Sequence, residues 1–342
     1  MSKIRNLAVC LLCLSFLLSG CADNQSNSSE ELPATNGEET TGGNNMERIG
    51  YTEAVPDSYL SPAENQGEVV RIDYNTYNYA DGGDELINKP ANVYLPYGYK
   101  EDGDRQYDIF YFMHGWTGTA DDFFSAENGA TKNILDHLMA NGEMAPTIVV
   151  AATFDEFNES ADFSRSVEEL TVFHNELANE LIPAVEDQFH TYAETTDAAG
   201  QQASRDHRGF GGFSLGAVTT WYTFIHNLDA FRYYLPMSGD SWISQQYGGR
   251  YQPEATAEYL QNLAEESPYG LDGFNIYAAT GTQDAVFDQV DGQMQAMLEL
   301  PEIFTDENFS YHWKQDGRHD FVAVNEYLYN ALPLFFPNEQ NN

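Results

Sequence analysis

The 342-residue sequence predicts an α/β fold, in which helices cover both faces of a mostly parallel central sheet. Two continuous apolar runs, at Asp108–Met113 and Thr147–Ala152, are typical of strands that are buried on both sides. Other strand patterns alternate with segments that carry apolar residues at helical spacing. Such alternation favours a parallel sheet. Hydrophobic residues make up 42% of the chain, which is enough for one large core.

The strand patterns begin after residue 48, where the composition changes. Residues 69–77 alternate like a strand with one buried face, and residues 92–96 form a second strand that ends at a proline. Residues 173–188 have helical spacing, and Pro183 predicts a kink or a restart of that helix. The other predicted elements are strands at 208–213, 231–237, 274–279 and 309–314 and a helix at 217–226.

The composition limits the possible partners and sites. The chain has 54 acidic and 15 basic residues, which gives a formal net charge of −39. Nucleic acid is therefore excluded as a partner, because phosphate binding needs clustered Lys and Arg, and a polyanionic substrate is disfavoured. The three cysteines are Cys10, Cys13 and Cys21, so the rest of the chain can form no disulfide and no cysteine metal site.

The N-terminus has the pattern of a bacterial lipoprotein. Residues 1–20 combine a basic start with an apolar run, at residues 7–18, that is short for a membrane span. The sequence Leu18-Ser19-Gly20-Cys21 resembles a lipobox, which implies cleavage before Cys21 and lipid attachment to its thiol. The alternative is an ordinary signal peptide with a chance cysteine. We expect a protein held by this lipid on the extracellular face of the bacterial membrane.

A polar segment follows the lipobox. Residues 22–47 are mainly Asn, Ser, Glu, Thr and Gly, and such a segment cannot bury enough apolar surface to offset its ordering entropy. We therefore predict a signal peptide at 1–20, a lipidated cysteine and flexible linker at 21–47, and one catalytic domain at 48–342.

The strongest chemical motif is Gly212-Phe213-Ser214-Leu215-Gly216. It fits G-x-S-x-G, the nucleophile elbow, in which a sharp turn between a strand and a helix presents a serine. The predicted strand and helix flank it on the expected sides. The alternative is an ordinary glycine-rich turn. We interpret Ser214 as a catalytic nucleophile.

A serine nucleophile needs a base and an orienting acid, which follow the serine in the α/β-hydrolase order. His319 is the one histidine on a glycine-containing loop past the last predicted strand. Asp284 directly follows the preceding strand, in Thr280-Gly281-Thr282-Gln283-Asp284. We favour Asp284 as the acid, with Asp240 and Asp288 as alternatives.

The developing oxyanion needs hydrogen-bond donors that are already in place. We expect the backbone N–H of Leu215 and that of Trp116, in the loop after the strand at Asp108–Met113, to supply them. Candidates to line the substrate cleft are aromatic: Trp116, Phe213, Trp242 and Tyr247. The alternative is that these rings belong to the core, above all Phe213.

Five motifs occur together and in order: Ala91 to Tyr99, His114-Gly115, the serine motif, Gly281 to Asp284, and Gly317 to Phe321. They resemble the esterase D-like group of α/β-hydrolases, most closely carbohydrate esterase family 1, the feruloyl and acetylxylan esterases. The resemblance spans about residues 66–336. It implies a Ser-His-Asp hydrolase of plant cell-wall polysaccharide esters, with Ser214, His319 and Asp284 in those roles and with no cofactor and no metal.

The sequence therefore predicts a secreted, lipid-anchored serine esterase. It would release feruloyl or acetyl groups from xylan or xylo-oligosaccharides through an acyl-enzyme. Two alternatives stay open: an acyltransferase on the same fold, and an inactive sugar-binding lipoprotein. The motifs depart from the family where Trp116-Thr117-Gly118 replaces a glycine-rich loop and where Arg318 precedes the base.

Overall fold

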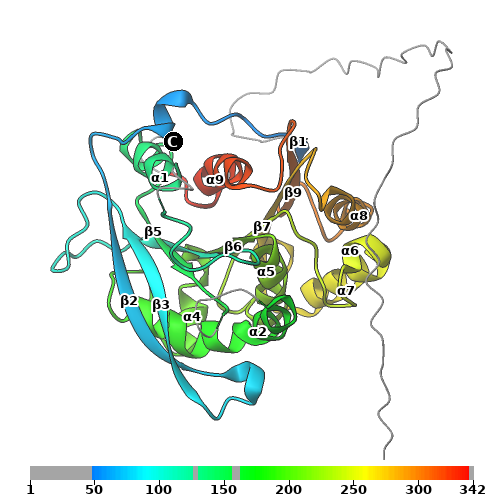
Figure 1. The fold of residues 1–342 in the computed structure, drawn as a ribbon, viewed down its shortest axis with the longest axis horizontal. Coiled ribbons are helices and arrows are strands. Elements are labelled where there is room, and N and C mark those ends of the chain that lie inside the picture. Colours follow the sequence, from blue (N-terminus) through cyan, green and yellow to red (C-terminus); the bar gives the residue numbers. More distant parts are fainter. Residues whose placement is uncertain (1–47, 126–129, 156–161, 339–342) are drawn as a thin grey trace, which may run out of the picture. The chain divides into compact units, whose positions relative to one another are not determined.

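The computed structural model describes residues 48–125, 130–155 and 162–338 (Figure 1). The predicted signal peptide, Cys21 and the linker at 21–47 lie outside these residues. Over the described residues, no helix combines the length and the apolar character that a membrane span requires.

A nine-stranded mixed sheet forms the centre of the described fold. Its spatial order is β1-β9-β8-β7-β6-β4-β5-β3-β2. Only the pairings of β3 with its two neighbours are antiparallel, and every other neighbouring pair is parallel. The strands are β1 (Ile49–Tyr51), β2 (Glu68–Tyr77), β3 (Leu86–Leu95), β4 (Asp108–Met113), β5 (Thr147–Ala152), β6 (Arg208–Phe213), β7 (Tyr233–Met237), β8 (Asn275–Gly281) and β9 (Phe309–Lys314).

Helices cover both faces of this sheet, as Figure 1 shows for α1 and α9 on one side and α2 and α5 on the other. The helices are α1 (Thr131–Ala140), α2 (Phe163–Glu176), α3 (Ile182–Glu186), α4 (Ala198–Ala203), α5 (Leu215–His226), α6 (Gly248–Tyr251), α7 (Pro253–Glu266), α8 (Phe287–Leu298) and α9 (Phe321–Phe335). Short 3₁₀ turns lie at Asp57–Leu60, Tyr79–Asp81, Arg205–His207 and Leu271–Gly273. The α/β prediction, with a mostly parallel sheet between helices, is confirmed.

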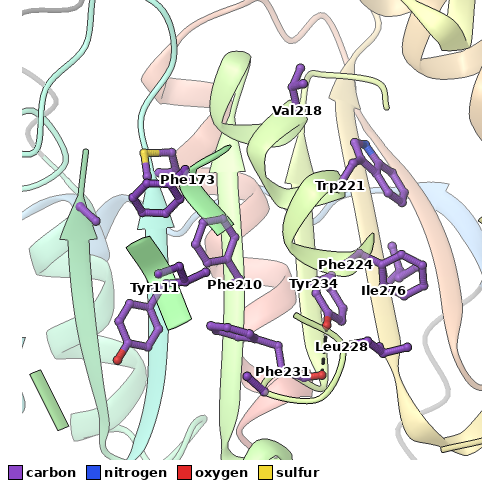
Figure 2. Close-up of a cluster of buried hydrophobic side chains, with 14 of the residues drawn as sticks. Tyr111, Phe173, Phe210, Val218, Trp221, Phe224, Leu228, Phe231, Tyr234 and Ile276 are labelled. Carbon is purple, nitrogen blue, oxygen red and sulfur yellow. Dashed lines mark hydrogen bonds between the residues drawn. The ribbon is translucent and has the colours of Figure 1, made fainter. Parts of the chain in front are cut away.

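The apolar run of β4 shows why this sheet needs helices on both faces. Successive strand side chains point to opposite faces. Ile109 and Tyr111 therefore join the core beneath α2 and α5, whereas Phe110 and Phe112 join the core beneath α1 and α9. Figure 2 shows the first of these cores, in which Trp221 projects from α5 among other buried aromatic side chains.

Most predicted strands match the structure, and the segment at 173–188 departs from a regular α-helix next to Pro183. The strands at 108–113, 147–152, 208–213 and 309–314 have the predicted bounds. The predicted strand at 92–96 is the second half of the longer β3. The 173–188 segment holds the end of α2, a π-helical turn at Leu177–Leu181 and α3, so the helix continues through a π-helical turn just before Pro183, which has no amide N–H to donate.

The parallel arrangement gathers the candidate residues at one edge. The chain leaves β6, β8 and β9 at the carboxyl edge of the sheet, and Ser214, Asp284 and His319 follow these strands in turn. Ligands bind at this edge in open α/β sheets.

Candidate active site

Ser214 lies at a strained turn between β6 and α5. Its φ of 59° falls in the left-handed region, which is unfavourable for a residue with a side chain. The Ser214 N–H donates to the carbonyl of Met237 at 2.9 Å, which ties the turn to β7. A Cβ at Gly216 would lie 2.1 Å from the carbonyl oxygen of Met113, so only glycine lets α5 approach β4 this closely. The local structure is that of a nucleophile elbow.

His319 is held by Asp284 from the neighbouring loop. The imidazole Nδ1 lies 2.9 Å and 3.1 Å from the two carboxylate oxygens of Asp284. The Asp284 side chain is fully buried, and its Oδ1 also accepts the backbone N–H of Val286 at 2.9 Å. Because the carboxylate can only accept, Nδ1 carries the proton and Nε2 is left to face a reacting group.

Backbone hydrogen bonds join the two loops that carry this pair. The N–H of Gln283 donates to the carbonyl of Gly317 at 2.9 Å, and the N–H of Thr282 donates to that of Lys314 at 3.1 Å. Asp320, the residue after His319, caps α9 by accepting the N–H of Ala323 at 3.0 Å. The position of the imidazole is therefore fixed from both sides.

His319 and Ser214 are brought to the same edge without a direct bond in this structure. The imidazole packs on Phe213, the residue before the serine, with ring centroids 4.4 Å apart. Over the described part of the chain, no hydrogen bond joins the Ser214 hydroxyl to His319. Catalytic hydrogen bonds are often long before substrate binds and shorten in the complex.

The two segments that carry the expected oxyanion donors lie beside the serine. A Cβ at Gly115 would lie 2.9 Å from Ser214 Cβ, which places the loop that carries Trp116 against the elbow. Leu215 is the first residue of α5, so its N–H has no acceptor within the helix. Among the described residues, neither the Leu215 N–H nor the Trp116 N–H donates a hydrogen bond. Both donors are therefore available to a ligand.

The buried side chain of His114 holds the loop that carries Trp116, a role that the sequence analysis did not assign. Its Nδ1 lies 2.8 Å from the carbonyl of Gly115 and its Nε2 lies 2.7 Å from the hydroxyl of Thr153. Burial lowers the pKa of His114 to about 4, so the ring is neutral at neutral pH. Nδ1 then donates to the carbonyl and Nε2 accepts the hydroxyl proton.

The two other candidate acids have different positions. Asp240 is fully buried and its carboxylate is bonded to Trp242 and to the backbone of Gly249, not to a histidine. Asp288 is exposed in the first turn of α8. Of the three acids, Asp284 is the one that contacts His319.

Three of the four predicted cleft aromatics form a continuous row with one additional ring. The centroid of Phe163 lies 5.3 Å from that of Trp116 and 6.3 Å from that of Trp242, which lies 4.8 Å from that of Tyr247. We call these four rings the aromatic row. Phe213 is not part of it and packs on His319. Phe163 was missed because it begins α2, far from every motif in the sequence.

The residues that the structure describes contain no candidate metal centre. No group of three or more His, Cys, Asp or Glu side chains there has a geometry that could hold a metal ion.

These features define an α/β-hydrolase: a serine with positive φ at a nucleophile elbow, a histidine held by a buried aspartate, and a mostly parallel sheet between helices. The Esterase family model matches residues 88–334. A stretch of 287 residues, 82% of the chain, is 38% identical to endo-1,4-beta-xylanase Y of Acetivibrio thermocellus and spans 24% of that protein. A stretch of 162 residues, 46% of the chain, is 30% identical to an endo-1,4-beta-xylanase/feruloyl esterase of Xylanibacter ruminicola and spans 20% of it. The chain thus corresponds to about a quarter or less of these relatives.

Comparison with solved structures agrees with this fold and family. The feruloyl esterase module of Clostridium thermocellum, a serine-to-alanine mutant in complex with sinapinate, matches with a TM-score of 0.71 and 35% identity over 84% of this chain and 93% of that one. A ferulic acid esterase of the fungus Anaeromyces mucronatus has the same fold, with a TM-score of 0.58 and 18% identity over 82% of this chain and 97% of that one. The chain belongs to the Esterase family and to carbohydrate esterase family 1, a group of carboxylic ester hydrolases.

Proposed function

We propose that this protein is a serine esterase that hydrolyses feruloyl or related hydroxycinnamoyl esters of xylan or xylo-oligosaccharides. The observation that carries the proposal is the pair of hydrogen bonds from His319 to Asp284 at the sheet edge that presents Ser214. Membership of carbohydrate esterase family 1 supports an ester as the substrate.

The residues act in two half-reactions. In the first, Ser214 Oγ attacks the ester carbonyl carbon while His319 Nε2 takes the hydroxyl proton. The N–H groups of Leu215 and Trp116 donate to the carbonyl oxygen as it becomes negative. His319 then gives its proton to the sugar oxygen that leaves, and the acyl group stays on the serine.

A water molecule reverses these roles in the second half-reaction. His319 takes a proton from water, the resulting hydroxide attacks the acyl carbon, and the proton returns to Ser214 as the free acid leaves. Asp284 stabilises the imidazolium in both halves and keeps the proton of the neutral ring on Nδ1. No cofactor takes part in this chemistry.

The aromatic row favours an aromatic acyl group over acetyl. A planar cinnamoyl ring can form aromatic contacts with such rings, and aromatic pairs contribute about 0.5–1.5 kcal/mol beyond area burial. The Clostridium thermocellum relative, complexed with sinapinate, is itself a feruloyl esterase module. An acetyl group has no ring and could make none of these contacts.

The chain also carries the lipobox-like sequence before Cys21, and the proposal includes a lipid anchor there on the outer face of the bacterial membrane. Carbohydrate esters outside the cell would then be the accessible substrates. Replacement of Cys21 by Ala should move the protein from the membrane fraction to the soluble fraction with unchanged kcat/KM. A variant that stays in the membrane fraction would contradict the anchor.

The esterase is tested with Ser214→Ala. The variant removes one hydroxyl, so its thermal midpoint should stay within a few degrees of wild type, whereas kcat should fall on the order of 10⁶-fold, as in other serine hydrolases. Methyl ferulate and feruloylated xylo-oligosaccharides are the substrates, and ferulate release is measured by chromatography. Turnover of the variant within a few-fold of wild type would remove Ser214 from the reaction.

A further inference from the structure

Asp240 is a buried carboxylate that the proposed reaction does not use. It follows β7 at the catalytic edge of the sheet, and none of its surface is exposed. A buried carboxylate is costly unless hydrogen bonds or a cation compensate it. Over the described residues no Lys or Arg forms an ion pair with Asp240. Its hydrogen-bond partners must therefore offset the cost of burying the carboxylate.

Each oxygen of Asp240 has its own donor. Oδ1 accepts the indole N–H of Trp242 at 3.0 Å, and Oδ2 accepts the backbone N–H of Gly249 at 2.7 Å. Burial raises the pKa of Asp240, and both hydrogen bonds oppose that rise. An asparagine has only one acceptor oxygen, so it could accept from only one of these two donors.

Contacts that do not involve the Asp240 side chain also hold the backbone between Ser241 and Gly249. The N–H of Ser241 donates to Oε1 of Gln293 in α8 at 2.6 Å. Gly249 packs closely on the same helix, since a Cβ there would lie 2.3 Å from the carbonyl oxygen of Gln289. These contacts should hold the segment in place when the carboxylate is changed, so the indole is the group that depends most on Asp240.

Trp242 occupies the middle of the aromatic row. Its ring contacts Phe163 on one side and Tyr247 on the other, and 7% of the residue is exposed. A buried indole N–H needs an acceptor, and loss of that acceptor favours rotation of the ring toward another one or toward water. The orientation of the ring is therefore set by the carboxylate behind it.

We propose that Asp240 is a positioning residue for acyl-group selectivity: by holding the Trp242 indole, it keeps the tilted and edge-on ring contacts of the aromatic row in the arrangement that receives a hydroxycinnamoyl ring. The inference rests on the proposed feruloyl esterase function. Asp240 has no part in the bond-making steps at Ser214, so a small acyl group should not sense its loss.

The test compares two esters with the same leaving group, 4-nitrophenyl ferulate and 4-nitrophenyl acetate, on the full-length protein. Asp240→Asn should lower kcat/KM for the ferulate roughly 5- to 30-fold, equivalent to about 1–2 kcal/mol, mainly through a higher KM. For the acetate, kcat/KM should stay within about two-fold of wild type. Asp288→Asn, an exposed carboxylate on α8, is the matched control and should change neither value.

A double-mutant cycle tests the route through the indole. Trp242→Phe keeps an aromatic ring and removes the N–H, so it should lose the same selectivity. If Asp240 acts through that N–H, adding Asp240→Asn to Trp242→Phe should change the ferulate-to-acetate ratio no further. Should Asp240→Asn fail to fold, an unchanged ferulate-to-acetate ratio in Trp242→Phe would still overturn the proposal, because Asp240 is proposed to act through the indole N–H.

The outcomes separate this inference from the function on which it rests. Equal losses on both esters, an unchanged ratio in Asp240→Asn, or additive effects in the double variant would overturn the positioning role. Wild-type protein that hydrolyses the acetate and not the ferulate would overturn the feruloyl function together with this inference. A wild type active on ferulate with an unchanged ratio in the variant overturns the inference alone.

Discussion

A single carboxylate determines how His319 is oriented. Asp284 accepts Nδ1–H at 2.9 Å, and its burial removes competing water from the bond. Replacing it with asparagine would present an amide that can donate to Nδ1 and stabilise the wrong tautomer of the imidazole. Since the base would then lack a free Nε2, the defect would be chemical and would leave substrate binding unchanged.

We predict that Asp284→Asn lowers kcat for 4-nitrophenyl acetate on the order of 10⁴-fold, as the equivalent change does in a serine protease. KM should change little. The thermal midpoint is measured in parallel to show that the variant is folded. A crippling loss on the acetate in Asp288→Asn or Asp240→Asn, with Asp284→Asn nearly active, would show that another acid orients the base.

Sequence order singles out Ser214 and His319 as the candidate nucleophile and base, but it leaves three positions for the acid. Asp240 and Asp284 both follow strands that end at the same edge, and order alone does not say which of the two loops lies beside His319. The pairing of β8 with β9 brings the Asp284 loop beside His319, and that pairing is long-range. Phe163 could not be identified for the same reason, since only packing brings it to Trp116.

Buried strands were predicted more accurately than the helices around them. β4 and β5 are apolar on both faces, so their bounds are visible in the sequence. α9 was not predicted: it is buried on most sides, includes polar residues such as Asn325 in its buried set, and has Pro333 inside it, so it lacks a clear amphipathic pattern. β1 has three residues and gives no period to detect.

α2 presents carboxylates to the interior, and this makes the element sensitive to pH. Burial, with the nearby charge of Asp155, raises the pKa of Glu169 to about 7, although Arg165 opposes the rise. Burial also raises the pKa of Glu176, whose carboxylate pairs with Lys89 at 2.7 Å. Between about pH 4.5 and pH 7 the folded state binds more protons at Glu169 than the unfolded state. Its contribution to stability therefore falls as pH rises through this window.

We predict that Glu169→Gln leaves stability nearly unchanged at pH 5, where the folded state holds Glu169 protonated. At pH 8 the variant should be more stable than wild type by about 1–3 kcal/mol, because it has no buried charge to desolvate. Urea unfolding midpoints at pH 5, 6, 7 and 8 measure the difference. Glu266→Gln, an exposed change on α7, should follow the wild-type pH curve, and a Glu169→Gln curve parallel to wild type would contradict the argument.

At the scale of the whole molecule, the dominant feature is the excess of acidic residues. A formal charge of −39 makes the compact state self-repulsive, since folding brings these charges closer together. α7 and α8 provide a local example, because Glu254, Glu258 and Glu299 line one groove between them. Glu254 and Glu258 are four residues apart on one helix, a spacing at which like charges destabilise.

We predict that added NaCl stabilises the fold. Raising the salt from 0.01 M to 1 M shortens the Debye length from about 30 Å to about 3 Å, which screens repulsion between surface carboxylates and hardly affects buried pairs such as Arg208 with Glu186. The urea midpoint at pH 7 should rise steadily over this range. Glu258→Lys should stabilise the protein by about 0.3–0.5 kcal/mol at low salt, since it turns a repulsive pair into an attractive one. That advantage should vanish in 1 M NaCl, where the wild-type pair is already screened. A variant whose advantage is the same at both salt concentrations, or a midpoint that falls with salt, would mean that surface repulsion does not limit the stability of this fold.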